Sequence, residues 1–128
     1  MQPAATVIIA NNVDVDADVT DARMFYMTTG STLTLTNSNI RGTSFSGTSR
    51  IFYISQAGAT LNCDGNVYGD GFAHVYYLPK IGSFTSDNNC FDDNTENFKI
   101  NAPSYATVAA YQAGESQDLN STIGGCAA

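Results

Sequence analysis

The residues of this sequence that could do chemistry are mainly carboxylates, and the first of them form a regular row. Aspartate occupies positions 14, 16 and 18 between Val13 and Val19. Successive side chains of a strand point to opposite faces, so Asp14, Asp16 and Asp18 would share one face. Oxygen ligands in such a row suit Ca²⁺, which is the candidate cofactor. We expect, however, that the chain requires no cofactor. The alternative is a solvated strand face whose charges discourage edge pairing, and the lack of an EF-hand-type loop favours it.

The single histidine and the three cysteines offer fewer chemical possibilities. His74 has no second histidine with which to share a metal, so we expect a surface residue. Three cysteines leave at least one thiol unpaired. Cys63 and Cys90 fall at apolar positions, where a free buried thiol is the expected state; a disulfide between neighbouring repeats is the alternative. The state of Cys126 stays open.

Charge and polarity limit the kinds of partner. The 128 residues include 12 acidic and 5 basic ones, and the net charge of −7 argues against nucleic acid and anionic membrane surfaces. No apolar run is long enough for membrane insertion, and no signal peptide is visible in Met1-Gln-Pro-Ala-Ala5. Only 13% of the residues are charged, whereas Ser, Thr, Asn and Gly are abundant. This composition is typical of extracellular or cell-surface β-proteins.

A short motif that recurs along the chain determines the expected architecture. Its copies are Arg23-Met-Phe-Tyr-Met27, Arg50-Ile-Phe-Tyr-Ile54, His74-Val-Tyr-Tyr-Leu78 and the shorter Asn97-Phe-Lys-Ile100. Glycines close the first three copies at positions 30, 58 and 82, which are 28 (58−30) and 24 (82−58) residues apart. Self-similarity at this period indicates a repeat architecture.

Apolar residues inside each repeat alternate, which predicts strands. Leu33 and Leu35 lie two positions apart, as do Phe52 and Ile54, and the intervening positions are largely polar or outward-facing. No helical stretch of ten or more residues precedes Pro103, so helical crossovers are excluded. The sequence therefore predicts an all-β fold, a parallel β-solenoid in which each repeat stacks on its neighbours. We expect one domain over residues 1–128, with rungs at about 5–30, 31–58, 59–82 and 83–101.

Asparagines recur with nearly the same spacing as the motif. Asn12, Asn39, Asn66 and Asn89 each precede an apolar residue, at intervals of 27, 27 and 23 (39−12, 66−39, 89−66). Stacked asparagines at a bend can share amide hydrogen bonds. We expect Asn39 and Asn66 to be buried in such a ladder; the alternative is that asparagine is simply common in turns.

The two ends of the solenoid are expected to differ. Ser104 is a candidate N-cap, Tyr105–Ala113 reads as a helix, and Gly114 suits its end, so residues 103–128 would form a cap. Nothing in residues 1–6 would cap the first rung, and Val7 and Ile9 would leave an apolar strand edge. We therefore expect a homo-oligomer, with the first rung or an exposed aromatic stripe in the contact.

The C-terminal region carries a resemblance to a known family. The helix of residues 105–113, the Gly-Glu-Ser-Gln-Asp-Leu-Asn-Ser turn that follows and Asp87-Asn-Asn-Cys-Phe91 resemble the closing part of right-handed parallel β-helix domains of the pectate-lyase-like superfamily. The motif match covers residues 83–123. The resemblance implies a short right-handed β-helix of about four rungs. Family domains usually have eight or more rungs, so the chain resembles the C-terminal portion of a longer one.

The resemblance also suggests where a catalytic site would lie. Members include polysaccharide lyases, in which carboxylates hold Ca²⁺ beside a basic arginine or lysine, and hydrolases that use carboxylate pairs. Alignment on the asparagines places Asp16, Thr43, Asp70 and Asp93 in one column and Asp14, Arg41, Tyr68 and Phe91 in the next. The candidate catalytic residues are accordingly Arg41, Asp70, Asp92 and Asp93. Their spread over several rungs favours a protein that is not an enzyme.

The aromatic motif supplies the candidate ligand-binding residues. If Phe25, Phe52, Tyr76 and Phe98 point inward, the outward positions are Tyr26, Tyr53 and Tyr77 together with Met24, Ile51 and Val75. Such a stripe could stack sugar rings or be buried by a partner or by the C-terminal helix. We expect a non-enzymatic extracellular or surface structural and binding module, with polysaccharide as its candidate ligand. The alternative is part or a remnant of a carbohydrate-active enzyme, a lyase or glycoside hydrolase acting on acidic polysaccharide.

Overall fold

The fold is known from a computed structural model of the chain. The structure describes residues 7–12, 14–17, 23–27, 29–42, 50–54, 57–69, 74–92, 97–124 and 126. Strands dominate these residues and one short helix lies near the C-terminus, so the all-β prediction is confirmed. This part of the chain contains no helix that is long and apolar enough to cross a membrane.

The strands form three sheets, which we name A, B and C. Sheet A contains, in spatial order, β1 (Val7–Asn11), β4 (Thr32–Thr36), β7 (Thr60–Asp64) and β10 (Ser83–Asp87). Sheet B contains β14 (Thr122–Ile123), β11 (Cys90–Phe91), β8 (Val67–Tyr68), β5 (Asn39–Gly42) and β2 (Asp14–Ala17). Sheet C contains β13 (Ser104–Tyr105), β12 (Phe98–Ile100), β9 (His74–Leu78), β6 (Arg50–Tyr53) and β3 (Arg23–Tyr26). All pairs are parallel except β12 with β13.

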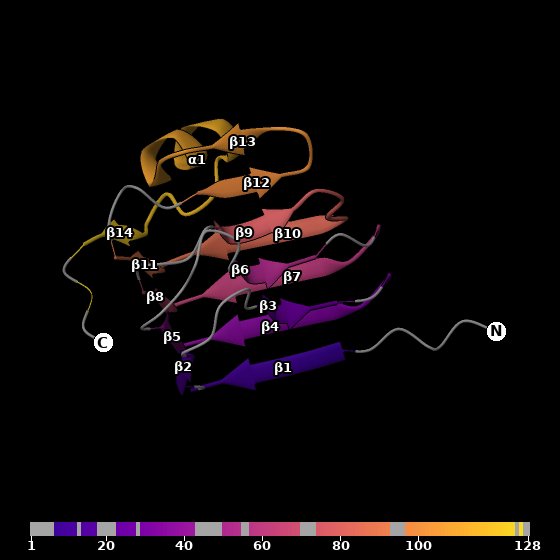
Figure 1. Cartoon of the computed structure of the whole chain (residues 1–128), viewed down its shortest axis with the longest axis horizontal. Helices are drawn as coiled ribbons and strands as arrows, with labels where there is room; N and C mark the ends of the chain where they lie inside the picture. The colour runs from indigo at the N-terminus through magenta and orange to yellow at the C-terminus, as the bar shows by residue number, and fades with distance from the viewer. Residues whose placement is uncertain are drawn as a thin grey trace.

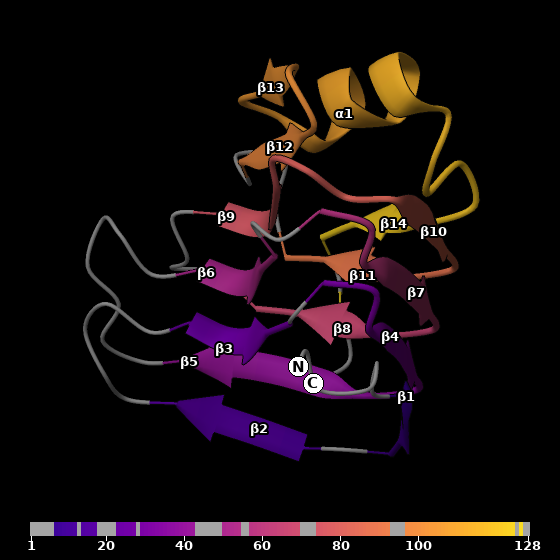
Figure 2. The same cartoon turned by 90° about the vertical axis from the view of Figure 1, so that its right-hand side faces the viewer.

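From β1 to β12, successive strands fall in different sheets, and strands three apart in the sequence lie side by side (Figures 1 and 2). The chain passes from sheet A to sheet B to sheet C and then returns to sheet A one strand further along. The sequence period sets the register, because Thr32 pairs with Thr60, 28 residues on (60−32), which is also the spacing of Gly30 and Gly58. Both glycines have positive φ, 76° and 78°, so each supplies a left-handed turn before sheet A.

The core lies between the three sheets and contains a stack of aromatic rings. Phe52, Tyr76 and Phe98 are fully buried, as predicted, and Phe25 is partly buried against them. Ring centroids are 5.0 Å apart from Phe25 to Phe52 and 5.2 Å apart from Phe52 to Tyr76. The stack continues to Phe98 and ends on Tyr111 of the helix, 4.2 Å from Phe98. The outward prediction for Ile51 and Val75 is wrong, because both are fully buried. Burying each of these side chains stabilises the folded state by about 1.5–3 kcal/mol relative to leaving it exposed.

Part of the predicted asparagine ladder is present, and the other part of the predicted alignment is shifted by one residue. Asn66 is buried, and its side-chain oxygen accepts a hydrogen bond from the Ser38 amide at 3.0 Å. Asn89 accepts one from the Asn66 amide at 2.8 Å. The prediction that Asn66 is buried in the ladder is therefore confirmed. The same prediction for Asn39 is wrong, because Asn39 lies in β5 opposite Val67 and Ser38 occupies the ladder position. Asn12 belongs to the adjacent left-handed column, whose members are Asn12, Asn37, Gly65 and Asn88, with φ of 58°, 51°, 71° and 55°.

The helix begins later than predicted. α1 spans Val108–Glu115, with Thr107 as N-cap accepting a hydrogen bond from the Ala110 amide at 3.1 Å. The predicted start at Tyr105 is wrong because Ser104–Tyr105 pairs with β12 as β13. Gly114 lies inside the helix, where a Cβ atom would come within 2.5 Å of the Tyr105 ring. Val108 and Tyr111 are fully buried, so α1 covers one end of the sheets (Figure 1).

The cysteines divide into a pair and a single thiol. Cys90 and Cys126 form a disulfide with Cα atoms 5.7 Å apart, so the expectation of a free thiol at Cys90 is wrong. The pairing arises because the C-terminal segment returns beside β11 as β14. Cys63 is a free buried thiol, as predicted, and burial raises its pKa to about 12.

Candidate functional site

The predicted catalytic residues do not form one compact group. Asp70 and Asp93 lie outside the described residues, while Arg41 and Asp92 lie inside them. The amide of Gly69 donates to the carbonyl of Ile40 at 2.7 Å, and the amide of Asp92 donates to the carbonyl of Tyr68 at 3.1 Å. Arg41 and Asp92 therefore share a column with Gly69 between them. Two strand spacings, about 9.6 Å, separate their backbones.

The column proposed for Arg41 is wrong by one residue. Tyr68 and Phe91 stand in register with Ile40, and all three are fully buried. In the β2–β5 pair the backbone of Arg41 is in register with that of Asp16, and Asn39 is in register with Asp14. The offset is the one found in the asparagine ladder, because the catalytic columns were aligned on it.

The predicted calcium ligands are only partly described. Asp14 and Asp16 have their backbone in β2, and Asp18 lies outside the described residues. Within the described part of the chain, no group of three or more His, Cys, Asp or Glu side chains could hold a metal ion. Calcium binding at these aspartates stays a prediction.

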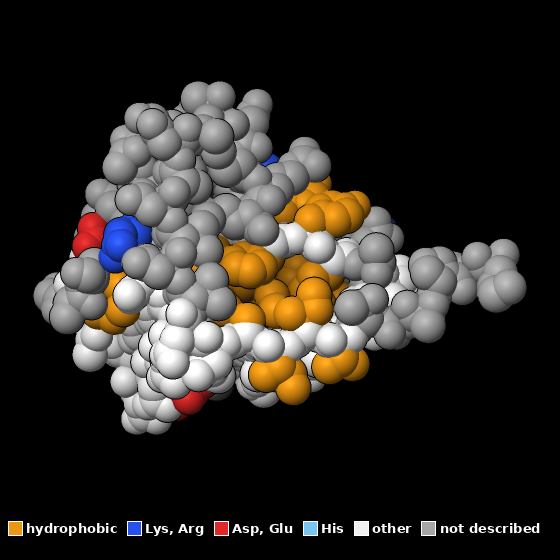
Figure 3. Space-filling model, turned by 90° about the horizontal axis from the view of Figure 1, so that it is seen from below, with side chains coloured by type: hydrophobic (Ala, Val, Ile, Leu, Met, Phe, Trp, Pro, Cys, Tyr) orange, Lys and Arg blue, Asp and Glu red, His pale blue; other side chains and the backbone are white. Residues whose placement is uncertain are grey.

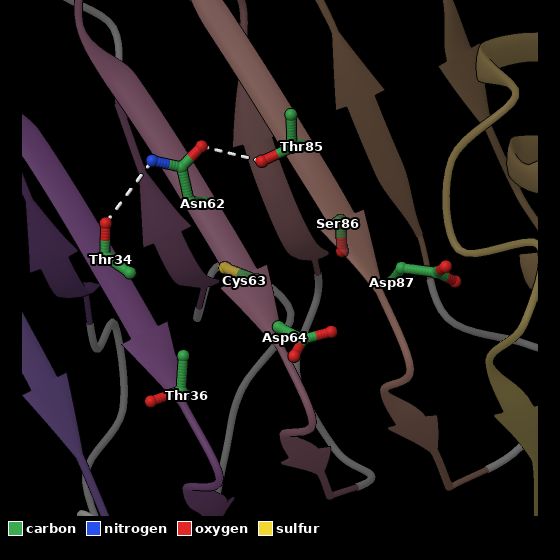
Figure 4. Close-up of a pocket in the computed structure, with 8 residues that line it drawn as sticks. All are labelled: Thr34, Thr36, Asn62, Cys63, Asp64, Thr85, Ser86 and Asp87. Carbon is green, nitrogen blue, oxygen red and sulfur yellow. Dashed lines mark hydrogen bonds between the residues drawn. The ribbon is translucent and has the colours of Figure 1, made fainter.

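A polar groove of about 210 Å³ runs over the outer face of sheet A. Its centre is a row of three hydrogen-bonded side chains from β4, β7 and β10 (Figure 4). The Asn62 side chain donates to the hydroxyl of Thr34 at 3.3 Å, and Thr85 donates to Asn62 at 2.6 Å. These bonds fix the side chains before any ligand arrives.

Two carboxylates lie together at one end of this groove. Asp64 and Asp87 are paired across β7 and β10, and each is held by an asparagine. Asn88 donates to Asp64 at 2.8 Å, whereas Asn120 donates to Asp87 from its side chain at 2.7 Å and its backbone at 2.9 Å. The bonds from Asn120 lower the pKa of Asp87. A glycosidase needs one carboxyl kept protonated by a raised pKa, and the lowered pKa of Asp87 does not suit that role.

The outer face of sheet C carries the predicted tyrosines. Tyr26 and Tyr53 stack at 5.9 Å with 14° between their planes, and Tyr53 and Tyr77 stack at 5.2 Å with 16°. Rings stacked in this way cover each other's faces, so sugar rings could lie on the ring edges or on the terminal Tyr26. The side chain of Tyr26 is 53% exposed. Ligand binding by the tyrosines stays a prediction.

Basic groups line the same face. The Arg50 guanidinium carbon lies 4.2 Å from the centre of the Tyr77 ring and 5.2 Å from that of Tyr53. Lys99 of β12 stands opposite Tyr77. Arg23 pairs with Arg50, and Arg50 pairs with His74. Three of the five basic residues of the chain, Arg23, Arg50 and Lys99, thus belong to sheet C, as does its only histidine.

His74 is the most perturbed group on this face. It is half-buried, and its ring meets Tyr77 edge-on at 5.0 Å. Its Nδ1 atom is buried and makes no hydrogen bond with any described residue. Burial, followed by the charges of Arg50 and Lys99, lowers the pKa of His74. The imidazole is therefore neutral at pH 7, in a region where a bound anion would favour its protonation.

We name the set Tyr26, Tyr53, Tyr77, Arg50, His74 and Lys99 the tyrosine–cation face. Alternation predicted its tyrosines, but sequence reasoning missed its basic side. A signal was present, because each of the first three motif copies begins with a basic residue or histidine, at Arg23, Arg50 and His74. Asp64 and Asp87 were also missed, since no motif marks them.

Comparison with family models, with curated proteins and with solved structures found no significant match to this chain. The interpretation of the tyrosine–cation face therefore depends on its own geometry and charge.

Proposed function

We propose that the three sheets form a short right-handed parallel β-helix like that of the pectate-lyase-like superfamily. The support is the regular passage through sheets A, B and C, with strands three apart in parallel register. One helix at the end of the stack, with Val108 and Tyr111 in the core, acts as the cap.

We further propose a non-enzymatic extracellular or cell-surface module that binds acidic polysaccharide on its tyrosine–cation face. The observation that carries this proposal is the concentration of basic residues on sheet C in a chain of net charge −7. A bulk-acidic protein repels a polyanion unless one face has the opposite sign. Arg50 and Lys99 supply that sign beside the tyrosine edges.

The ligand chemistry follows from these groups. A guanidinium presents a planar fork that matches a carboxylate or sulfate, and a lysine adds a point charge. Tyrosine edges offer hydroxyl groups and apolar ring hydrogens to sugar hydroxyl and C–H groups. An unbranched polyuronate lying along the stack would meet these groups on successive strands.

An oxidising location is supported by the Cys90–Cys126 disulfide. Structural disulfides persist in secreted and surface proteins and are rare in reducing compartments. The remaining thiol, Cys63, is 2% exposed and so is protected from exchange. Both observations fit an extracellular or surface module.

Binding to polygalacturonate, measured by calorimetry, tests the proposal, with fully methyl-esterified polygalacturonate as the uncharged comparison. We expect binding of the charged polymer alone, weakening as salt is raised. Lys99→Gln should raise Kd by about 2- to 5-fold, since an ion pair at the protein surface contributes about 0.5–1 kcal/mol. Lys80→Gln, which removes an exposed lysine from the turn after β9, is the matched control. Equal binding of both polymers would overturn the proposal.

A pH series sharpens the same measurement. The pKa of His74 is lowered from 6.5, so the imidazole gains its proton only below that value. As the pH falls from about 7 to about 5, the added charge should strengthen binding of the polyuronate, whose carboxylates stay largely ionised. His74→Gln should remove this pH dependence. An unchanged pH profile in that variant would exclude His74 from the site.

The alternative is a polysaccharide lyase, and one observation favours it. Arg41 and Asp92, a basic and an acidic residue, share a column with Gly69 between them, and a Cβ atom at Gly69 would lie only 2.9 Å from the Arg41 Cβ. A β-elimination assay on polygalacturonate with and without Ca²⁺ examines this possibility. Activity that disappears in Arg41→Gln would replace the binding module with an enzyme.

A further inference from the structure

Among the described residues, no strand or helix covers the end of the sheets opposite α1, and this end is apolar. It is formed by β1, β2 and β3, the terminal strands of sheets A, B and C. A hollow of about 180 Å³ opens there, lined by Ile8, Ala10, Phe25, Tyr26, Met27 and Leu33. Figure 3 looks at this end and shows hydrophobic side chains gathered in the hollow. Val7, Ile8 and Ile9 are 67%, 52% and 77% exposed.

Strand β1 also has one unpaired side among the described residues. The amide of Asn12 donates to the carbonyl of Thr36, toward β4. In a parallel pair, alternate residues bond to the same neighbour, so Ile8 and Ala10 also bond to β4. The backbone groups of Val7, Ile9 and Asn11 then point away from sheet A. The five residues of β1 include no proline and no charged residue, and these are the residues that protect such an edge from pairing.

We propose that a second copy of this chain covers this end, with β1 pairing antiparallel to β1 of the partner about a two-fold axis at Ile9. Outward-pointing backbone groups at Val7, Ile9 and Asn11 fit the alternation of an antiparallel ladder. Ile9 forms a hydrogen-bonded pair with the partner's Ile9, and Val7 forms such pairs with the partner's Asn11 on both sides of the axis. Sheet A becomes a continuous sheet of eight strands, four from each copy.

The order of the three sheets also makes the proposed β1–β1 contact complementary in charge. Sheet B follows the C-terminal end of each sheet A strand, and sheet C precedes the N-terminal end. A two-fold axis through β1 exchanges these ends, so β2 of one copy meets β3 of the other. The sequence of β2 contains Asp14 and Asp16, whereas β3 begins with Arg23. An isologous contact therefore opposes an acidic strand to a basic one twice.

A second copy suits this surface better than a stack of copies in one direction. Head-to-tail stacking would require the other end of the sheets to be open, but Val108 and Tyr111 of α1 fill that end. A closed dimer uses only the open end. It also brings the two apolar hollows face to face, which removes both from water.

Light scattering coupled to size exclusion tests the dimer on the full chain. We expect 27.2 kDa, twice the 13.6 kDa of one chain. Ile9→Lys and Ile9→Glu should each give a folded monomer, because like charges would lie directly opposite across the axis. An equimolar mixture of the two variants should restore the dimer. This rescue occurs only when residue 9 of one copy faces residue 9 of the other.

Two further variants separate contact from folding. Thr34→Lys places the same charge on the outer face of β4, one strand inward, and should leave the dimer intact. Ile9→Pro removes only an edge amide and should abolish the dimer while the circular dichroism spectrum of the monomer persists. A monomeric parent chain, assembly beyond a dimer, or failure of the mixed lysine and glutamate variants to pair would each overturn the proposal.

Discussion

The two ends of the sheet stack differ in how their apolar residues are covered. At the C-terminal end, β13 and α1 cover the last strands, and Tyr111 extends the internal ring stack from Phe98 at 4.2 Å. At the N-terminal end, Val7, Ile8 and Ile9 are largely exposed. The repeat supplies the stacking between strands at both ends alike. A terminus that is covered needs residues outside the repeat pattern, and only the C-terminal end has them among the described residues.

The covered end also has a buried polar network that the open end lacks among the described residues. Asp118 is 1% exposed and has φ of 56°. Its carboxylate accepts hydrogen bonds from the Asn89 side chain at 2.7 Å, the Tyr111 hydroxyl at 2.6 Å and the Ser121 hydroxyl at 2.6 Å. The network ties α1, the final turn and the asparagine ladder together. We therefore expect mutations to cost far more at this end.

The largest expected effect is at Asp118. Asp118→Ala leaves three donors, from Asn89, Tyr111 and Ser121, without their acceptor. An unsatisfied buried donor costs about 1–3 kcal/mol, so we expect a loss of about 3–5 kcal/mol in the free energy of unfolding, measured by urea denaturation. The control is Asp92→Ala, an exposed aspartate on β11's C-terminal side. Equal stability of the two variants would show that the network does not hold the cap.

Removing the disulfide is expected to cause the second-largest loss of stability. Cys126→Ser opens a covalent loop with a sequence separation of 36. Chain-entropy reasoning gives a loss of about 3–4 kcal/mol for a loop of this size. Cys63→Ser is not a suitable control because it places a hydroxyl in the core, so reduction of the parent chain provides the comparison. If Cys126→Ser unfolded at the same denaturant concentration as the oxidised parent, the tail would contribute nothing to the cap.

The smallest expected effect is at the open end. Ile9→Thr changes a side chain that is 77% exposed and matches it to Thr34, its neighbour on the outer face. The stability of the isolated monomer, measured at high dilution, should change by less than about 0.5 kcal/mol. A loss comparable with that of Asp118→Ala would mean that both ends are equally closed, and the contrast between them would disappear.

Strand pairing followed from the sequence because parallel stacking places residues one period apart side by side. The alternation of Leu33 and Leu35 gave the inward face, and the glycine spacing gave the register with Leu61. The error at Asn39 has a physical origin. The bend before sheet B uses two adjacent columns that both accept asparagine, and Ser38 can hold the second because its short side chain suits the same bend.

Features that depend on contacts distant in sequence were not predictable in this way. Ser104 and Tyr105 satisfy a helix-start pattern, but the exposed edge of β12 pairs with them instead. The partner of Cys90 depends on where the C-terminal segment runs after α1. In the tyrosine–cation face, alternation placed the tyrosines, whereas the position of Arg50 over two rings depends on a side-chain conformation that no sequence period encodes.

The disulfide has a consequence for the resistance of the chain to proteolysis. The bond between Cys90 and Cys126 encloses β12, β13, α1 and β14 in one covalent ring. Proteases cut chains at exposed turns, and residues 101–103 form an exposed connection between β12 and β13 within this ring. A cut there opens the ring without releasing either piece. The nicked cap remains attached through sulfur and can settle back onto Phe98, so a single cleavage event leaves the molecule whole.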